Sequence, residues 1–353
     1  MHKAISRVFF YEKHNSIYFL YNPVQRYVIK IGNKDGKKGK VSNLKDYWFG
    51  RYVNYIQKYV VTLDKNFPKM MQLYRNFSNG IKDFYSDLQK YLSILVKQNV
   101  EGLDNLTRQE IQLAYTMPKD LKKILPVILI SLIPFSNYII MPSVFLFPRQ
   151  LLTHHFWTPE QKASFMVYFH KKRFKYSRPL FYCMESKINY INNELLKIKW
   201  NGIIACLGSG EHPTIQNVIS CITLFKSSPY SMNTLEHKHM KKLLGIHGLS
   251  MWTPFRRRRL IERAILLKRM DDAIVKEGGV DNMSIESLCW ALSFRGLNPV
   301  NMSIEDMKNW LDDWLILSAS VDNSTLSLLL HSPIFLAYNN SNNLHLPNMN
   351  CPT

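Results

Sequence analysis

Two runs of basic side chains are the residues of this chain best suited to a defined chemical interaction. Ammonium and guanidinium groups bind phosphate oxygens, and each phosphate that they neutralise makes nucleic acid binding weaker as the salt concentration rises. We therefore predict that both runs contact nucleic acid phosphates, with a solvated helix surface or a contact with lipid headgroups as the alternatives. The residues are Lys171, Lys172, Arg173, Lys175 and Arg178 in the first run, and Arg256, Arg257, Arg258 and Arg259 in the second.

The charge of the whole chain also favours an anionic partner. The chain holds 46 lysine and arginine residues against 26 aspartate and glutamate residues, a formal net charge of +20. The basic excess is densest in residues 148–270, which contain 21 basic and 6 acidic side chains, whereas residues 271–353 contain 3 and 10. Such a basic block attracts nucleic acid phosphates or anionic lipid headgroups, and both can apply to one protein.

Histidines are the residues that most invite a metal site. The candidates among the chain's 11 histidines are the pair His154-His155, then His170, His237, His239 and His247. None has the i, i+4 spacing with a nearby glutamate that metalloproteases use, and no cysteine joins them at zinc-like spacing. Gly208-Ser209-Gly210 lacks both the lysine of a phosphate-binding loop and the Gly-x-Ser-x-Gly pattern of a hydrolase nucleophile. We expect no metal, no cofactor and no enzymatic activity.

A long apolar segment precedes the basic block. Residues 124–147 contain no charged side chain, and as one helix they would rise about 36 Å, more than the roughly 30 Å hydrocarbon core of a bilayer. We predict one transmembrane helix, kinked at Pro134 and followed by a membrane-junction motif, Pro148-Arg149-Gln150. A core hairpin broken at Pro134 and an interfacial re-entrant loop are the alternatives.

The part of the chain before this segment divides by composition. Residues 1–45 are basic and nearly free of acidic side chains, which indicates a leader with a mitochondrial transit peptide and a linker; a disordered basic leader is the alternative. Apolar residues at helical spacing predict amphipathic helices in residues 46–123.

Downstream of the apolar segment, every strong pattern is helical. Thr158-Pro159-Glu160-Gln161 has the sequence of a capping box with proline at the first helical position, and Ser284 and Ser303 can cap two further helices. These two helices are expected to form a hairpin that is docked by the tryptophans of the second one. We predict an all-α protein with one helical domain over residues 148–331 and a tail over residues 332–353.

Several short motifs occur together between residues 118 and 331. They are Pro134-Phe135-Ser136-Asn137-Tyr138, LFPRQLLTHHFWTPEQ at residues 146–161, His212-Pro213-Thr214-Ile215, Met232-Asn233, Leu297-Asn298, Trp310-x-x-x-Trp314-Leu315, and LSLLLH at residues 326–331. In these motifs the chain resembles the leucine-zipper and EF-hand-containing transmembrane (LETM) family of mitochondrial membrane proteins, and most of all its short members. The proline-arginine motif after the apolar segment is the most specific of them.

The resemblance implies a single-pass mitochondrial membrane protein with a helical ribosome-binding domain of the LETM type. It implies the inner membrane, with the C-terminal domain in the matrix, and the outer membrane is the alternative. The implied partners are the mitochondrial ribosome, through ribosomal RNA or ribosomal proteins, and membrane lipids, with a homo-oligomer as a further option. The implied function is ribosome binding in support of mitochondrial membrane organisation.

The chain departs from the long members of that family in two ways. It has no long heptad array and no D-x-[DN]-x-[DN]-G loop, so calcium sensing by an EF-hand is not expected. Residues 124–147 also hold no ionisable group that could relay a proton or coordinate an ion. Exchange of K⁺ or Ca²⁺ against protons, or membrane organisation without ribosome binding, is the alternative function.

Overall fold

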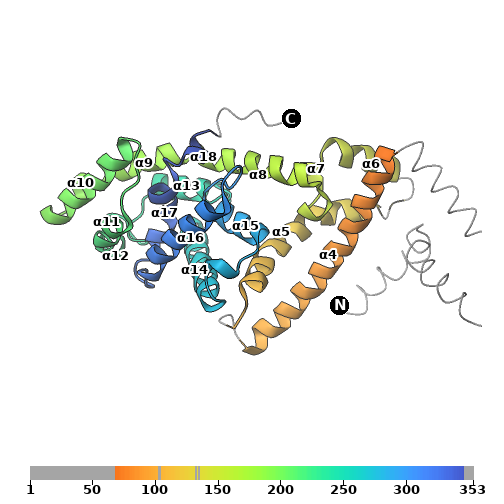
Figure 1. The fold of residues 1–353 in the computed structure, drawn as a ribbon, viewed down its shortest axis with the longest axis horizontal. Coiled ribbons are helices and arrows are strands. Elements are labelled where there is room, and N and C mark those ends of the chain that lie inside the picture. Colours follow the sequence, from red (N-terminus) through yellow and green to blue (C-terminus); the bar gives the residue numbers. More distant parts are fainter. Residues whose placement is uncertain (1–67, 102–104, 132, 134–135, 346–353) are drawn as a thin grey trace, which may run out of the picture. The chain divides into compact units, whose positions relative to one another are not determined.

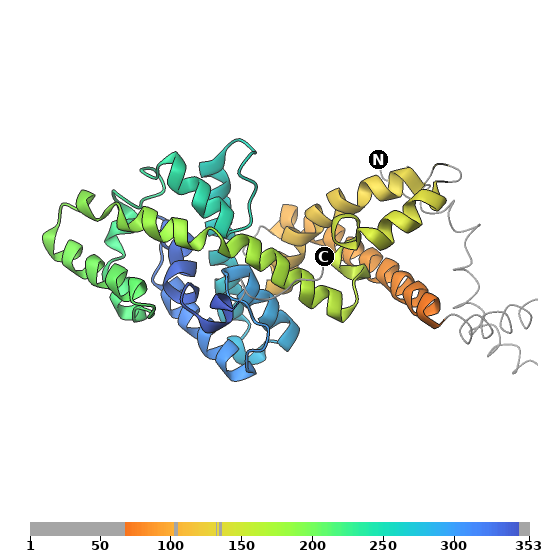
Figure 2. The same ribbon diagram turned by 90° about the horizontal axis from the view of Figure 1, so that it is seen from above.

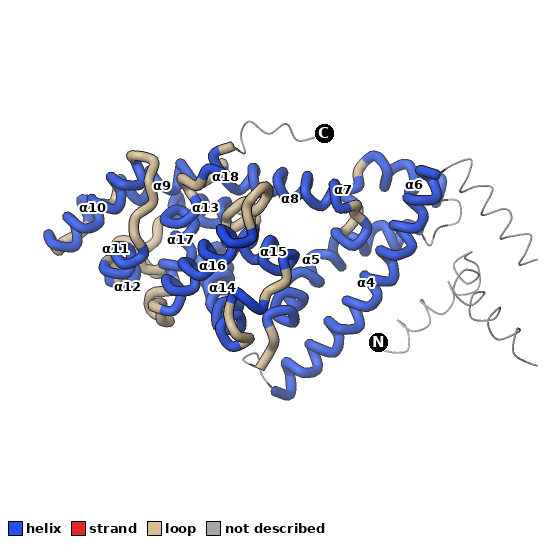
Figure 3. Tube along the Cα trace, viewed as in Figure 1, coloured by secondary structure: helices blue, strands red, loops and turns tan. Residues whose placement is uncertain are grey.

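The computed structural model describes residues 68–101, 105–131, 133 and 136–345. The leader and linker predicted for residues 1–45 lie outside these residues, as do residues 46–67 and the last residues of the tail. In the described part every regular element is helical, as predicted (Figures 1 and 3). The chain divides into two units between Tyr85 and Ser86. Of the first unit, only the N-terminal part of helix α4 (Pro68–Glu101) is described.

The second unit, from Ser86 onward, contains the rest of α4 and all later elements. They are α5 (Arg108–Ser131), α6 (Asn137–Leu146), α7 (Pro148–Leu151), η2 (His154–Phe156), α8 (Pro159–Phe174), α9 (Ser177–Glu185), η3 (Ile188–Tyr190), α10 (Glu194–Gly208), α11 (Ile215–Ser220), α12 (Thr223–Lys226), α13 (His237–Ile246), α14 (Arg256–Lys276), η4 (Val280–Asn282), α15 (Ile285–Arg295), α16 (Ile304–Ala319), α17 (Ser327–Ala337) and α18 (Ser341–Leu344).

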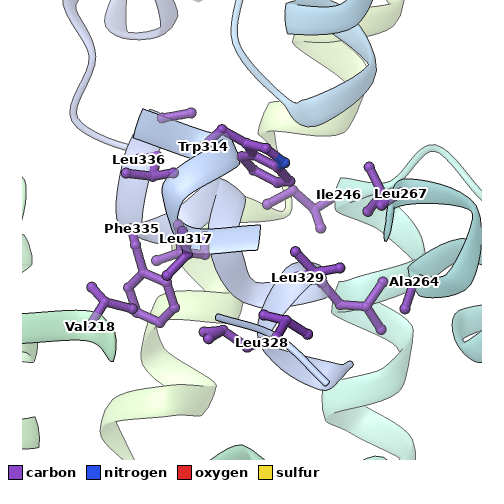
Figure 4. Packing of buried hydrophobic residues seen from close by; sticks show 14 of the residues in the cluster. Val218, Ile246, Ala264, Leu267, Trp314, Leu317, Leu328, Leu329, Phe335 and Leu336 are labelled. Atoms are coloured by element: carbon purple, nitrogen blue, oxygen red, sulfur yellow. The ribbon is translucent and has the colours of Figure 1, made fainter. Parts of the chain in front are cut away.

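The core of this unit forms around α17, which contacts α9, α12, α13, α14 and α16. Each of its 11 residues is buried, including Ser327, His331 and Pro333. Figure 4 shows Leu328 and Leu329 of α17 among side chains of α14 such as Ala264 and Leu267. A helix that is apolar on every side has no face for solvent, so the neighbouring helices must enclose it completely.

A buried ion pair joins three of these helices. Arg295 at the end of α15 pairs with Asp271 of α14, with 3.1 Å between its Nε and Oδ1 of the aspartate. The other carboxylate oxygen of Asp271 accepts hydrogen bonds from Trp314 Nε1 (3.0 Å) and Ser318 Oγ (2.6 Å) of α16. Because both oxygens are satisfied, the charge is tolerated in a site that excludes water.

The local signals for helix starts are confirmed. The Thr158 side chain accepts a hydrogen bond from the backbone of Gln161 while the Gln161 side chain accepts from the backbone of Thr158, which is a complete capping box. Ser284 and Ser303 cap α15 and α16 through their hydroxyls. These two helices pack against each other, and the Trp310 indole donates to the Leu336 carbonyl at 2.7 Å, so the predicted docking of the hairpin is also confirmed.

The apolar segment corrects our prediction of one transmembrane helix over residues 124–147. Its residues are divided between α5 and α6, which contact each other, and α6 has only 10 residues. A helix of that length rises about 15 Å, half of a hydrocarbon core, and the first half of α5 is polar. No helix in the described ranges is long and apolar enough to cross a membrane.

The connectivity of α5 and α6 is that of the alternative hairpin, but the hairpin is not buried in a core. Large apolar side chains remain exposed along it: Leu125, Leu129, Ile130, Ile133, Leu146 and Phe147. We call these six residues the α5–α6 tip.

Candidate nucleic-acid interface

The first basic run lies where α8 continues into α9 in nearly the same direction (Figure 2). Lys172 and Lys175 are exposed, and Lys171 is half-buried. Arg178 is exposed on α9, where its Nε donates to the hydroxyl of Tyr182 at 3.1 Å. Lys172, Lys175 and Arg178 therefore have the exposure that a phosphate contact needs.

Arg173 corrects the prediction that the whole run faces a partner. Its guanidinium donates to three backbone carbonyls, those of Ile246 (2.8 Å), Ser293 (2.8 Å) and Phe294 (3.3 Å). Burial, together with the nearby charge of Arg263, lowers the pKa of Arg173 to about 9. Arg173 thus joins α8 to the ends of α13 and α15, and three of its five N–H donors bind backbone carbonyls inside the protein.

In the second basic run, two arginines bind a loop of the protein itself and two are exposed. Arg256 donates to the Met251 carbonyl at 3.4 Å, and Arg259 donates to the Ser250 carbonyl at 2.7 Å and to the Thr253 hydroxyl. Arg257 and Arg258 are exposed, and Arg258 pairs with Glu262 through its Nε at 2.9 Å. Four successive residues of a helix face all round its axis, so this division follows from the geometry of α14.

The arginines that face inward hold a loop with two exposed aromatic rings. Trp252 is 94% exposed and Phe255 is 74% exposed. Phe255 has a left-handed backbone, with φ at 58°, and is the residue directly before α14. We call residues 250–255 the Trp252 loop. Sequence reasoning overlooked it, although a tryptophan and a phenylalanine around Thr253-Pro254, next to four arginines, were a readable signal.

Helix α13 connects the two basic runs. Arg257 Nη2 lies 3.5 Å from the carbonyl of Leu235, just before α13, and Arg173 binds the carbonyl of Ile246, the last residue of α13. Between these ends, Lys238 and Lys241 are exposed on the helix. A helix of 10 residues rises about 15 Å, so the contacts that the two basic runs make at the ends of α13 are about that distance apart. We call Lys172, Lys175, Arg178, Lys238, Lys241, Arg257 and Arg258, together with the Trp252 loop, the basic surface.

The motif predicted for a membrane junction makes internal contacts. Pro148 begins α7, and its carbonyl accepts a hydrogen bond from Trp157 Nε1 at 3.2 Å. The guanidinium of Arg149 lies 3.7 Å from the ring centroid of Tyr168, a cation–π contact. Gln150 is exposed. Pro148 and Arg149 thus fasten α7 to η2 and α8.

These observations define an all-helical domain that is built around the fully buried α17 and carries a basic surface. The family model described as "LETM1-like, RBD" matches residues 106–335, so the chain belongs to the LETM family, with a domain of the ribosome-binding type.

Three relatives show how far the similarity extends. The chain is 30% identical to "LETM1 domain-containing protein 1" of Homo sapiens over 308 residues, which are 86% of this chain and 85% of that protein. It is 30% identical to the protein of the same name in Xenopus tropicalis, over 82% of this chain and 83% of that protein. It is 23% identical to "LETM1 domain-containing protein mdm28, mitochondrial" of Schizosaccharomyces pombe, over 77% of this chain and 59% of that protein. No solved structure matches the chain.

Proposed function

We propose that this chain is a mitochondrial protein that binds the mitochondrial ribosome through its basic surface and acts by binding, without catalysis. The family supports a ribosomal partner, and the name of the Schizosaccharomyces pombe relative supports the compartment. The observation that carries the proposal is the Trp252 loop, in which Arg256 and Arg259 hold the backbone so that Trp252 stands in solvent beside Arg257 and Arg258.

This arrangement supplies two kinds of contact that RNA requires. Exposed lysine and arginine side chains bind phosphates, and an exposed indole offers a flat face for an unpaired base. One stacked base is worth about 1–3 kcal/mol. If five of the seven exposed cations of the basic surface, those of the two basic runs, each neutralise one phosphate, log K falls with log salt at a slope of roughly −3.5 to −4.5.

The test is co-sedimentation of the full chain with mitochondrial ribosomes across a series of KCl concentrations. The variant Arg257→Gln/Arg258→Gln is expected to bind more weakly and to flatten the salt slope by about 1.5, and Trp252→Ala is expected to weaken binding about 5- to 100-fold with the slope unchanged.

A matched control keeps the change in net charge constant. Lys226→Gln/Lys276→Gln removes two exposed cations, on α12 and at the end of α14, that are not part of the basic surface. Equal loss of binding in this control and in the arginine variant, or binding by the unaltered chain that ignores salt, contradicts a specific role of the basic surface.

The exposed α5–α6 tip supports a second part of the proposal, a contact with the surface of the inner membrane from the matrix side. Its six large apolar side chains are 48% to 72% exposed, and α5 carries Lys119 and Lys122, both exposed, before the first of them, Leu125. An apolar tip with adjacent cations has the chemistry of a segment that lies in the headgroup region of an anionic membrane without crossing it.

Vesicle flotation tests this part separately. The full chain is mixed with phosphatidylcholine vesicles with and without cardiolipin, and the anionic vesicles are expected to retain it. Leu129→Ser/Leu146→Ser is expected to abolish retention, whereas Leu195→Ser/Ile198→Ser, which alters two equally exposed apolar residues of α10, retains it. Flotation that is unchanged in the first variant refutes the membrane contact and leaves ribosome binding untouched.

A further inference from the structure

A cluster of two histidines and two aspartates lies away from the basic surface. Asp87 of α4, His154 and His155 of η2 each offer one ligand atom, and these three atoms lie within 4.8 Å of one another. The closest pair is His155 Nε2 and Asp87 Oδ2, at 3.2 Å. Beside them, Asp120 of α5 places its Oδ2 3.4 Å from His154 Nδ1.

We propose that this cluster is a Zn²⁺ site, with Asp87, His154 and His155 as ligands and Asp120 as the carboxylate that orients His154. Imidazole nitrogens and carboxylate oxygens bind zinc at about 2.0–2.2 Å in tetrahedral sites, which sets two ligand atoms about 3.3–3.5 Å apart. The distance of 3.2 Å between His155 Nε2 and Asp87 Oδ2 is close to this separation of two ligand atoms. A water molecule supplies the fourth ligand.

The outer contacts of both imidazoles have the pattern found around zinc ligands. Metal-bound histidines bind a carboxylate or another oxygen through the second ring nitrogen, which fixes the tautomer and the ring orientation. His155 Nδ1 lies 3.1 Å from the hydroxyl of Thr153, a fully buried residue, and His154 Nδ1 faces Asp120. His155 can therefore donate through Nδ1 and bind the metal through Nε2, while Nδ1 of His154 lies near the Asp120 carboxylate without a hydrogen bond to it.

Burial strengthens the assignment. The side chain of His155 is only 4% exposed, and Oδ2 of Asp120 is shielded from solvent without a hydrogen-bond partner among the described residues. Lys119 and Lys123 of the same helix already act electrostatically on Asp120, and zinc bound to His154 would add a positive charge beside this oxygen. His154 is the most exposed member, with 47% of its side chain accessible, so it can rotate to close the site.

A neutral His155 that donates Nε2–H to Asp87 explains the 3.2 Å distance without a metal. Zinc binding would release this proton, because the metal takes the place of the hydrogen on Nε2, and titration with zinc distinguishes the two states.

The position of the site gives the metal a role. Asp120 lies in α5 just before the α5–α6 tip, and His154 and His155 follow α7 directly. A metal held by these residues therefore joins the two ends of the segment that carries the tip and fastens them to α4. Zinc would fix the base of the α5–α6 hairpin.

The experiment uses the full chain, freed of metal with a chelator and titrated with ZnCl₂ in a calorimeter. We expect one zinc per chain, at least tenfold weaker binding in both Asp87→Asn and His154→Ala, and an increase of Tm with zinc that both variants lose. His154→Ala is chosen because that side chain is partly exposed, so the variant is expected to fold, which circular dichroism verifies. Cobalt in place of zinc reports tetrahedral ligation by its visible absorption.

His237→Ala is the matched control, because His237 is an exposed histidine on α13 outside the cluster. Zinc affinity in this control is expected to equal that of the unaltered chain. The proposal is overturned if the unaltered chain takes up no zinc, or if His154→Ala and Asp87→Asn bind it as tightly as the control does.

Discussion

Acidification is expected to unfold this domain because of four buried histidines. His239 and His331 form a pair, with 2.8 Å between their Nε2 atoms. His331 donates Nδ1–H to the Ser327 carbonyl at 2.7 Å, so its Nε2 must accept the proton of His239 Nε2. A second proton on His331 would go to Nε2 and place N–H against N–H, and a second proton on His239 would go to Nδ1, which is buried and has no hydrogen-bond partner among the described residues. The pair is therefore stable only while both rings are neutral.

Burial lowers the pKa of each of these groups. The pKa falls to about 3 in His170, where the charge of Arg173 adds to burial, to about 2 in His239, where His331 adds to it, and to about 4 in His331. In His247, burial and the charge of Arg263 hold the pKa well below its ordinary value. In the folded protein these four imidazoles therefore stay neutral at pH 5.5. The same imidazoles take up a second proton in the unfolded chain, where their pKa has its ordinary value of about 6.5.

The sign and size of the effect follow from proton linkage. The pKa values of these histidines are lower in the folded protein than in the unfolded chain. Their contribution to the free energy of unfolding is therefore fully present above pH 6.5 and is lost as the pH falls below 6.5. Each histidine contributes a loss of about 1 kcal/mol between pH 6.5 and 5.5, so four contribute about 4 kcal/mol. That is a large part of the roughly 5–15 kcal/mol that stabilises a typical domain.

Urea unfolding of the full chain, followed by circular dichroism at pH 7.5, 6.5 and 5.5, measures this loss. His331→Asn can keep the bond to the Ser327 carbonyl, and we expect it to reduce the loss between pH 6.5 and 5.5 by about 1 kcal/mol, whatever its effect at neutral pH. His237→Asn, the same substitution at an exposed site, is the matched control. A loss under about 1 kcal/mol in the unaltered chain would refute the linkage argument.

Three substitutions test the packing that positions the basic surface, each by urea unfolding against a neighbouring control. Asp271→Ala leaves the guanidinium of Arg295 buried without its partner and is expected to cost about 3–5 kcal/mol, while Asp272→Ala, which removes an exposed pair with Lys268, costs under about 0.5 kcal/mol. Arg173→Ala leaves three carbonyls without their donor and is expected to cost about 3 kcal/mol. The control Lys172→Ala is expected to change stability by at most about 0.5 kcal/mol. Similar costs for the two variants would mean that Arg173 is not a packing residue. Gly245→Ala would place a Cβ 2.4 Å from the ring of Tyr176 and is expected to cost about 1–3 kcal/mol, while Gly202→Ala, which meets nothing within 4 Å in α10, is expected to gain up to about 1 kcal/mol, so equal signs at the two glycines would contradict the contact.

The parts of the fold that depend on neighbours in sequence could be predicted. Caps at Thr158, Ser284 and Ser303 need only three or four consecutive residues, and the helical period of the apolar residues establishes the all-α class. The family could be predicted as well, because its motifs are short and local.

The parts that depend on distant residues could not. Arg173 is one of several cations in its run, and only the carbonyls of Ile246, Ser293 and Phe294, more than 70 positions later, separate it from exposed Lys172. The His154-His155 pair looked incomplete as a metal site because its carboxylates come from Asp87 and Asp120, on other helices. The length of the apolar segment likewise predicts one long helix. In the structure its residues form parts of two helices, α5 and α6, which contact each other.

The complete burial of α17 also determines when the domain can form as the chain is synthesised. The five helices that pack most extensively against α17 precede it in the sequence, from α9 to α16, so each is made before the helix that fills the centre between them. Until Ala337 has left the ribosome that makes the chain, these helices lack their central packing partner, and native pairing must wait for contacts between residues far apart in sequence. A chain that stops before Ser327 would keep every cation of the basic surface and still lack the buried helix against which their supporting helices pack.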